Sequence, residues 1–571
     1  MCGILVCKTD NLNNSVKSRF KYALEGLKTR GPDETRMIQN KNLLVGFTRL
    51  SINNIKNGSQ PFKSLCGKYI IVFNGEIVNY KDLAQSISEK NVKMRYGHEA
   101  EVIINLFILY GDKCVTFLRG FFAFVIIEIK SNNIFLAVDR FSIKPLYYYQ
   151  EKKNNLIIIA SDFSVLIKNN LVKQELNLSK ILDYFSLARE LDNSTIFQNI
   201  KKLKASSIAK IKKGKLQTFQ YWHPFKNNLT FENNKNISFL IQNKLSEVIN
   251  LWKIAETKIS LCLSTGVDSQ ILNHFFYKNK VDMSRFFLKE SEKKFFKFDK
   301  TIKIKPDSKK VLSLFNKFAR NTYNPFPLVH SSSTSLFQLY NEIKRKNFKF
   351  TFTGEGSDEI FGGYERYKRQ LYLIKNKKLN FIQMIMEMYK HEINILKKNF
   401  HKHIMLDFQK KLVNKISNVE FHSKKIENKI LEFDQICWIP VVIQRHDFIG
   451  MNYSLEVRPP YLDHELVELI NSVPTNLKYN LFNTKIILRK ILEKNFNYRP
   501  TKFKIGTPSL FEKIMQNKKE VSNFKEIIFY GEFKKILNTE KIIKKIKKNF
   551  DKQDSIFLWR LYTINKILYK F

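Results

Sequence analysis

The sequence predicts two domains, the second of them an α/β domain built on a parallel sheet. At 571 residues the chain is too long for one ordinary domain and can bury two sizeable cores. In the second half, an amphipathic helix over 237–252 precedes a short apolar strand over 259–263, which a small-residue loop joins to a further helix. Such strand–loop–helix units are typical of parallel sheets, which bind ligands at the carboxyl ends of their strands. We expect domains over 2–200 and 237–571, joined by a linker over 201–236.

The composition fits a folded protein with reduced cysteines. Apolar residues make up 44% of the chain and aromatic residues 13%, far from a disordered composition. No run of about eighteen apolar residues could cross a bilayer, and no signal peptide precedes the first motif, so we expect no membrane partner and a cytoplasmic location. The six cysteines lack CxxC spacing, which argues against a zinc site and against a disulfide framework.

The formal net charge of +46 raises the question of a nucleic-acid partner. The lysines are spread along the whole chain with asparagine and isoleucine, as AT-rich coding produces, and basic runs such as 541–548 lack a recognised binding module. A compositional bias explains this charge better than a function does. We therefore expect no specific nucleic acid, only salt-sensitive association with polyanions.

Cys2 follows the initiator methionine and becomes the N-terminal residue once that methionine is removed. Its thiol can then attack a carbonyl carbon, while the α-amine of the same residue accepts the thiol proton directly or through one water. For this residue alone, a chance cysteine is the simpler interpretation. The motifs that follow it favour the nucleophile.

Several downstream residues suit the hydrolysis of an amide. Asn74 and Gly75 follow the apolar strand 69–73, where a side-chain amide and a backbone N–H can both donate to the oxyanion of a tetrahedral intermediate. Free glutamine also carries an α-carboxylate, which the planar fork of an arginine binds well, and an α-ammonium, which requires carboxylates. The candidates for these contacts are Arg49, Glu76 and Glu99. Taken singly, a tight turn at Asn-Gly and a solvated arginine are the simpler interpretations.

Four segments of the first 200 residues form one pattern: 1–4, 30–33, 74–77 and 139–147. The pattern resembles the N-terminal-nucleophile glutaminase domain of class B asparagine synthetases. This resemblance implies an α+β domain of the αββα type that cuts glutamine to glutamate and ammonia. Three positions depart from the family: Glu99 stands where Asp is usual, Ser142 where Gly is usual, and Asp162 where Glu is usual.

In the second half, the loop Ser264-Thr265-Gly266-Val267-Asp268-Ser269 lies between the strand 259–263 and a helix. A small-residue loop at a helix N-terminus forms an anion-binding nest of N–H groups and hydroxyls. The ending Gly-Lys-Ser/Thr of a Walker A loop is absent, so the pattern is that of a pyrophosphate loop. The expected ATP ligands here are Ser264, Gly266, Asp268 and Ser269. The family usually has Gly where this chain has Thr265.

The segment 350–364 carries the most specific motif of the chain, Thr353-Gly354-Glu355-Gly356-Ser357-Asp358-Glu359. The segment resembles the synthetase motif of the same family almost residue for residue. We expect Thr353 and Gly354 to contact the nucleotide, and Asp358 to lie opposite Asp268 so that the two carboxylates hold Mg²⁺ between phosphate oxygens. Glu355 is then available to orient or deprotonate ammonia.

Lys485, in a Lys-x-x-Leu-Arg pattern, is the expected catalytic cation. An ammonium aimed at the α-phosphate stabilises the charge that grows there as pyrophosphate leaves. Two features depart from the family. Phe448 stands where Arg is usual after Asp447, and in the segment 280–314 the strand that contacts adenine is not recognisable.

The resemblance implies a glutamine-dependent asparagine synthetase, an ATP-dependent ligase with Mg²⁺ as cofactor. Its substrates would be glutamine, aspartate and ATP, and a homodimer is one option for its assembly. Ammonia released at neutral pH would be protonated in solvent, so coupling requires an enclosed path between the two sites. Three alternatives stay open: a different carboxylate acceptor such as a sugar uronic acid, a glutaminase with a degenerate regulatory second half, and, more distantly, a tRNA-modifying relative of the pyrophosphate-loop class.

Overall fold

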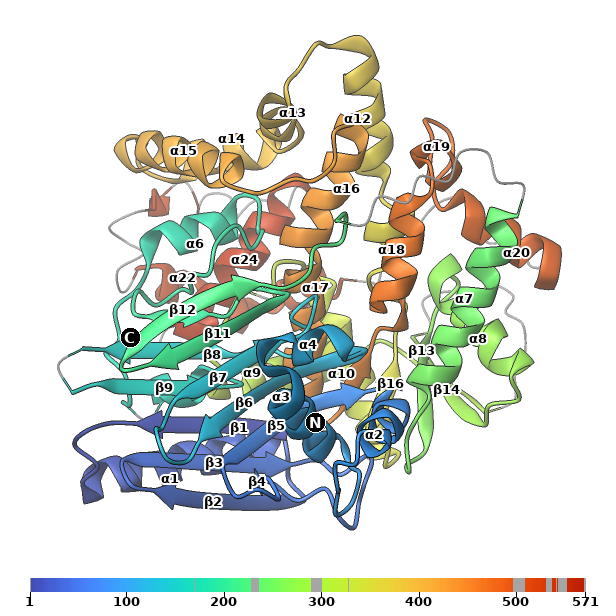
Figure 1. The fold of residues 1–571 in the computed structure, drawn as a ribbon. Coiled ribbons are helices and arrows are strands. Elements are labelled where there is room, and N and C mark those ends of the chain that lie inside the picture. The colour runs from blue at the N-terminus through green and yellow to red at the C-terminus, as the bar shows by residue number, and fades with distance from the viewer. Residues whose placement is uncertain are drawn as a thin grey trace.

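The structure, a computed structural model, describes most of the chain and shows two domains packed against each other (Figure 1). The residues described are 2–152, 154–168, 170–226, 236–288, 300–326, 328–496, 509–529, 537–540, 542 and 552–568. Within these residues, none of the helices has the length and apolar character that crossing a membrane requires. All six cysteines are free thiols.

The first domain stacks two six-stranded sheets face to face (Figure 1). One sheet has the order β10-β8-β9-β1-β3-β2 and the other β12-β11-β7-β6-β5-β4, and every pair of neighbours is antiparallel. The bounds are β1 Cys2–Lys8, β2 Glu34–Asn40, β3 Leu43–Arg49, β4 Phe62–Lys63, β5 Tyr69–Ile77, β6 Gly120–Glu128, β7 Ile134–Val138, β8 Tyr147–Glu151, β9 Leu156–Ala160, β10 Ile200–Lys202, β11 Ser207–Lys212 and β12 Lys215–Gln220.

Helices cover the outer faces of both sheets. Between the sheets, Ile4 and Val6 of β1 meet Val72 of β5 in one buried cluster. On the outside, α1 (Asn14–Gly26), α5 (Ser164–Lys168) and α6 (Leu178–Phe185) cover the first sheet, while α2 (Tyr80–Glu89), α3 (Glu99–Tyr110) and α4 (Cys114–Phe117) cover the second. The layers therefore run helix, sheet, sheet, helix, which confirms the predicted αββα domain.

The second domain contains a five-stranded sheet in the order β15-β14-β13-β16-β17, and all of its strand pairs are parallel. The bounds are β13 Ile259–Leu263, β14 Met283–Leu288, β15 Thr301–Ile304, β16 Phe350–Phe352 and β17 Glu456–Arg458. The chain adds strands on one side of β13 and then returns to add β16 and β17 on the other side. A parallel sheet opens a crevice where the order reverses in this way, and the carboxyl ends of β13 and β16 meet there.

Helices cover both faces of this sheet, which confirms the predicted α/β domain. On one face lie α7 (Ile237–Trp252), α8 (Val267–Lys278), α18 (His464–Ser472) and α20 (Ile486–Phe496), and on the other lie α9 (Ser308–Asn321), α10 (Ser333–Arg345) and α17 (Ile439–Met451). The remaining helices include a layer at the top of Figure 1. They are α11 Ser357–Phe361, α12 Glu365–Asn376, α13 Phe381–Met388, α14 Lys390–Asn399, α15 Lys402–Ser417, α16 Ile426–Cys437, α19 Thr475–Lys478, α21 Phe511–Ile514, α22 Lys518–Phe529 and α24 Lys552–Leu568.

Two segments are more regular than the sequence predicts. Residues 207–220, assigned above to the linker 201–236, form the hairpin β11–β12, and β11 pairs with β7. The sheet of the first domain therefore extends to Gln220, and the predicted boundary at residue 200 is too early. Within 280–314, where no family strand is recognisable, β14 and β15 complete the parallel sheet, and 289–299 lie outside the described residues.

Buried ion pairs cross the seam between the domains. Asp447 of α17 accepts from Arg30 Nη2 at 2.9 Å and from Lys144 Nζ at 3.0 Å, and all three side chains are at most 3% exposed. Arg119 makes a bidentate pair with Asp463, at 2.8 and 3.0 Å. Burial alone would raise the pKa of Asp447, but Arg30 and Lys144 hold this pKa below its usual range. Each such pair ties the two domains into one relative position.

We expect Asp447→Asn to lower the free energy of unfolding by about 3–5 kcal/mol, because two buried cations would lose their counter-charge. Denaturant titration followed by tryptophan fluorescence measures this change. Asp282→Asn is the matched control: Asp282 pairs with Lys300 on the surface, with side chains 80% and 58% exposed, and its loss should cost less than about 1 kcal/mol. Equal effects of the two substitutions would show that the seam pair does not hold the domains.

Candidate active sites

Cys2 opens the central strand β1, and its position is fixed from two sides. In the pairing of β1 with β3, Cys2 lies opposite Arg49, and its backbone N–H donates to Asn74 Oδ1 at 2.8 Å. The thiol belongs to a residue only 9% exposed. Burial raises the pKa of the Cys2 thiol, against the opposing effects of the Leu50 backbone N–H and the charge of Arg49. The thiol therefore needs a base before it can act as a nucleophile.

Asn74 has the donor that an oxyanion site requires. Because Cys2 N–H uses its Oδ1, the Asn74 amide is oriented with Nδ2 on the opposite side, and this buried Nδ2 has no hydrogen-bond partner among the described residues. An unpaired buried donor is costly unless a ligand satisfies it. Oxygen developing negative charge beside Cys2 would be such a ligand.

Gly75 was expected to be the second donor, and its conformation requires glycine. Its φ is +147°, and a Cβ atom there would lie 2.1 Å from the carbonyl oxygen of Phe121 on the neighbouring strand β6. A side chain would thus push β5 away from β6 at the point where Asn74 and Gly75 face Cys2. The backbone path, and with it the direction of the Gly75 N–H, depends on this residue.

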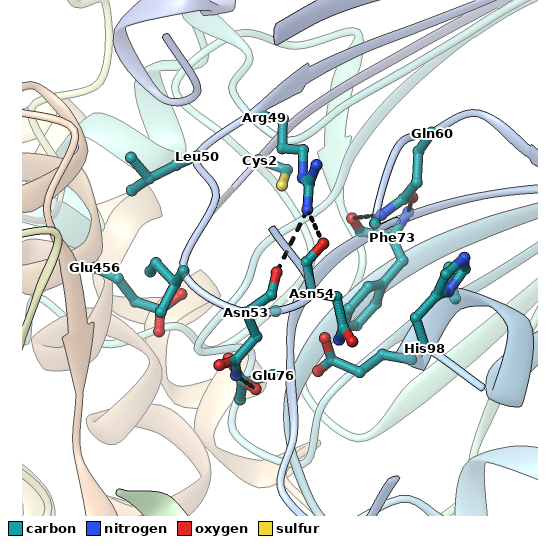
Figure 2. A pocket seen from close by; sticks show the side chains of 15 residues that line it. Cys2, Arg49, Leu50, Asn53, Asn54, Gln60, Phe73, Glu76, His98 and Glu456 are labelled. Carbon is teal, nitrogen blue, oxygen red and sulfur yellow. Dashed lines mark hydrogen bonds between the residues drawn. The ribbon is translucent and has the colours of Figure 1, made fainter. Parts of the chain in front are cut away.

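A small cavity of about 40 Å³ lies beside Cys2 and is lined by the predicted Arg49, Gly75, Glu76 and Glu99 (Figure 2). Arg49 donates to the carbonyl oxygens of Asn53, Asn54 and Ile55, in the loop after β3, at 3.3, 2.6 and 3.1 Å. A substrate carboxylate would have to replace these carbonyl oxygens as the partner of Arg49.

Carboxylates outnumber cations on the other wall of the cavity. Glu76 Oε2 and Glu456 Oε1 both accept from Arg458, at 2.8 and 2.6 Å, and Glu99 Oε1 accepts from the backbone N–H of Ile77 at 2.8 Å. Burial raises the pKa of Glu76 to about 7 despite Arg458, and burial together with Glu76 raises the pKa of Glu99 well above its usual range. A substrate ammonium would supply the positive charge that this group lacks.

Arg458 and Glu456 also belong to the surroundings of Cys2, and no motif of the sequence predicts this. Both lie on β17 of the second domain, and Arg458 is 382 residues away from Glu76 in the chain. Their contact with Glu76 follows from the packing of the domains and has no local signal.

The second site lies at the crevice between β13 and β16. After β13, Ser264 Oγ and Ser269 Oγ lie 2.8 Å apart, Gly266 N–H donates to Ser264 Oγ at 3.1 Å, and α8 begins at the next residue. The half-buried Thr265 is accommodated within this loop. The fold thus brings Ser264, Gly266, Asp268 and Ser269 to a helix N-terminus, where an anion is favoured.

The loop after β16 packs directly on this nest. A Cβ atom on Gly354 would lie 2.7 Å from Asp268 Cβ and 3.2 Å from Ser269 N, so only glycine permits the approach. Thr353 is buried, and its N–H donates to Arg458 O at 3.0 Å. The two nucleotide motifs of the sequence therefore form one site.

Lys485 lies between the two carboxylates that were expected to face each other. Its Nζ is 2.5 and 2.6 Å from the oxygens of Asp268 and 2.5 Å from Asp358 Oδ1. Burial alone would lower the pKa of Lys485, but Asp268 and Asp358 raise it. The described residues contain no group of three or more His, Cys, Asp or Glu side chains that could hold a metal by themselves. Mg²⁺ commonly uses one or two carboxylates together with substrate phosphates, so this pair fits it.

Glu355 lies at the edge of the same site and is held by α17. Its Oε1 is 2.9 Å from His446 Nε2 and 3.5 Å from Arg445 Nη2, and its side chain is 28% exposed. Sequence analysis gave no role to either α17 residue. The Asp447 that follows them carries the seam pair described above, so one helical turn contacts both the second site and the first domain.

Comparison with known proteins assigns each half separately. Residues 1–222 match the family described as "Glutamine amidotransferase domain", and residues 297–520 match "Asparagine synthase". Among curated relatives, "Asparagine synthetase [glutamine-hydrolyzing] 3" of Bacillus subtilis is 23% identical over 513 residues, which are 84% of this chain and 81% of that protein. "Asparagine synthetase [glutamine-hydrolyzing] 2" of the same organism is 27% identical, over 84% of this chain and 68% of that protein.

The chain is also similar to proteins that are not named as asparagine synthetases. "Amidase chry2" of Gibberella zeae is 23% identical over 85% of this chain and 84% of that protein. Among solved structures, the glutamine phosphoribosylpyrophosphate amidotransferase of B. subtilis aligns with a TM-score of 0.30 at 13% identity, over 50% of this chain and 65% of that chain.

We expect Gly75→Ala to lower the rate of glutamine hydrolysis by about 100-fold or more, because the new Cβ displaces the donors from the oxyanion position. Glutamate release at saturating glutamine measures the loss. Gly67→Ala is the matched control: this glycine also has positive φ, at +71°, but its nearest neighbour would be 3.8 Å away, so activity should be retained. Full activity in Gly75→Ala would exclude this strand from the oxyanion site.

Proposed function

Because the chain belongs to the class B, glutamine-hydrolysing asparagine synthetase family, we propose that it makes asparagine from aspartate, with nitrogen from glutamine and energy from ATP. It is an ATP-dependent ligase with a glutaminase domain and a synthetase domain.

In the first domain, Cys2 is the proposed nucleophile. Its thiol adds to the amide carbon of glutamine, the Asn74 Nδ2 and Gly75 N–H groups stabilise the oxyanion, and ammonia leaves. Water then releases glutamate from the thioester. With Met1 removed, the α-amine of Cys2 is the base that its buried, protonated thiol requires. Glu76 and Glu99 would hold the substrate ammonium, and Arg49, once released from its loop, the carboxylate.

In the second domain, the β-carboxylate of aspartate is proposed to displace pyrophosphate from the α-phosphate of ATP. The loop with Ser264, Gly266 and Ser269 binds phosphate, and Thr353 and Gly354 approach the nucleotide. A Mg²⁺ ion held by Asp268 and Asp358 would neutralise phosphate charge. Lys485, freed from the two carboxylates, would move to the α-phosphate. Glu355 orients or deprotonates the ammonia that displaces AMP.

One observation carries the proposal that both sites act together: they share the strand β17. Glu456 lines the Cys2 cavity and Arg458 pairs with Glu76 of its wall, while the carbonyl of Arg458 accepts from Thr353 N–H at 3.0 Å in the nucleotide loop. This shared strand supports the transfer of ammonia from one site to the other.

Aspartate is proposed as the acceptor on the similarity to the synthetases. A different carboxylate, such as a sugar uronic acid, is the alternative. A degenerate second half is disfavoured by the assembled cluster of Lys485, Asp268 and Asp358. Cytoplasmic location and homodimer formation stay predictions; the free thiols fit a reducing compartment.

The direct test is a mass-spectrometric product count with untagged protein, glutamine, Mg-ATP and aspartate, leaving out each in turn. Glutamate, AMP and asparagine should rise together. Glutamate without asparagine or AMP would contradict aspartate as acceptor, and a screen of other carboxylates for AMP release would then separate a different acceptor from a degenerate second half.

Cys2→Ala and Lys485→Ala should have opposite effects. Cys2→Ala should abolish glutamine use and leave synthesis from free ammonium, because only the nucleophile is lost. Lys485→Ala should lower the rate of AMP formation by about 100-fold or more and leave the rate of glutamate release unchanged. The activity that each variant retains shows that the variant is folded. Loss of both reactions in either variant would contradict two separate chemical sites.

A further inference from the structure

Tyr340, His446 and Glu355 form a hydrogen-bonded chain behind the nucleotide site. Tyr340 Oη on α10 bonds to His446 Nδ1 on α17, and His446 Nε2 lies 2.9 Å from Glu355 Oε1 in the loop after β16. Tyr340 and His446 are 0% and 3% exposed, whereas the Glu355 side chain is 28% exposed. The chain is thus buried at one end and reaches the site at the other.

The chemistry of the partners fixes the direction of each hydrogen bond. A carboxylate only accepts, so His446 Nε2 carries the proton that it shares with Glu355. Burial lowers the pKa of His446, despite the opposite effect of Glu355, and a neutral imidazole then has an accepting Nδ1. Tyr340 must donate to it, and burial, which raises the pKa of Tyr340 well above its usual range, keeps the phenol protonated. One tautomer of His446 satisfies both neighbours.

Arg445 supports the same carboxylate oxygen from another side. Its Nη2 lies 3.5 Å from Glu355 Oε1 and 3.1 Å from His446 Nε2. Arg445 Nη2 and His446 Nε2 both carry protons and do not stabilise each other, so the acceptor for both is Glu355 Oε1. Two donors from one helix, α17, therefore act on the same carboxylate oxygen of Glu355.

Glu355 needs this support because its side chain is long and 28% exposed, although its backbone is held between the closely packed Gly354 and Gly356. Fixing a glutamate side chain costs rotamer freedom, and a hydrogen bond to the charged carboxylate offsets this cost. Loss of the His446 donor would therefore widen the range of orientations of the carboxylate relative to the second site.

We propose that His446, held by Tyr340, is a positioning residue that fixes the Glu355 carboxylate for the step in which ammonia attacks the activated acceptor. This inference rests on the proposed function and extends it to residues outside every motif of the sequence. Activation of the carboxylate by ATP precedes this step and does not use Glu355, so the two half-reactions should respond differently.

The test compares His446→Gln with His446→Asn. Glutamine can place its Nε2 near the position of the imidazole Nε2 and keep the donor to Glu355, whereas the amide of asparagine is too short. We expect His446→Asn to lower the kcat of ammonium-dependent asparagine formation by about tenfold or more, part of the range for general base catalysis, and His446→Gln to retain most of it. Tyr340→Phe should give an intermediate loss.

Two further readouts separate positioning from folding. Aspartate-dependent exchange of pyrophosphate into ATP and glutamate release should both stay near wild type in His446→Asn. Hydroxylamine, which is largely unprotonated at neutral pH, should restore turnover as the nucleophile, because it depends less on a base.

Wild-type kinetics in His446→Asn, or equal losses of exchange and synthesis in both variants, would overturn the inference alone. Absence of aspartate-dependent exchange in the wild-type protein would instead contradict the proposed function, and the inference with it.

Discussion

Buried charge at the domain seam is the constraint on which the rest of the structure depends. Arg458 is 0% exposed and is shared by Glu76 and Glu456, and Asp447 is enclosed by Arg30 and Lys144. Separating the domains by even a small distance would leave these groups without counter-charges, at a cost that surface pairs do not carry. The pairs therefore specify one arrangement of the domains. That arrangement places β17 between the Cys2 cavity and the nucleotide loop.

Each site lies at the ends of strands of its own domain. Cys2 is the first residue of a central strand, so its amino group and thiol lie at the end of that strand, beside Asn74 and Gly75 of β5. The nucleotide motifs follow β13 and β16, the strands at which the order of the parallel sheet reverses. In this conformation Arg49 donates to its own loop, and Lys485 pairs with Asp268 and Asp358. Both cations must exchange these partners for substrate groups when substrates bind.

Local patterns predicted much of this molecule and missed its long-range pairings. The fold of both domains, the position of Cys2 beside Asn74 and Gly75, and the approach of Asp268 to Asp358 all follow from short motifs. The roles of Arg458 and His446 do not, because their partners lie far away in the chain and are set by packing. The hairpin of 207–220 was assigned to the linker, because its pairing with β7 is a long-range contact without a local signal.

The central claim is that nitrogen passes between the two sites without mixing with solvent. The direct measurement follows ¹⁵N from the amide of labelled glutamine into product, in the presence of aspartate, Mg-ATP and a large excess of unlabelled ammonium. The shared strand and the rigid seam predict that the product amide keeps most of the label. Label diluted to the level of the bulk ammonium would show that the sites act independently and would contradict this account.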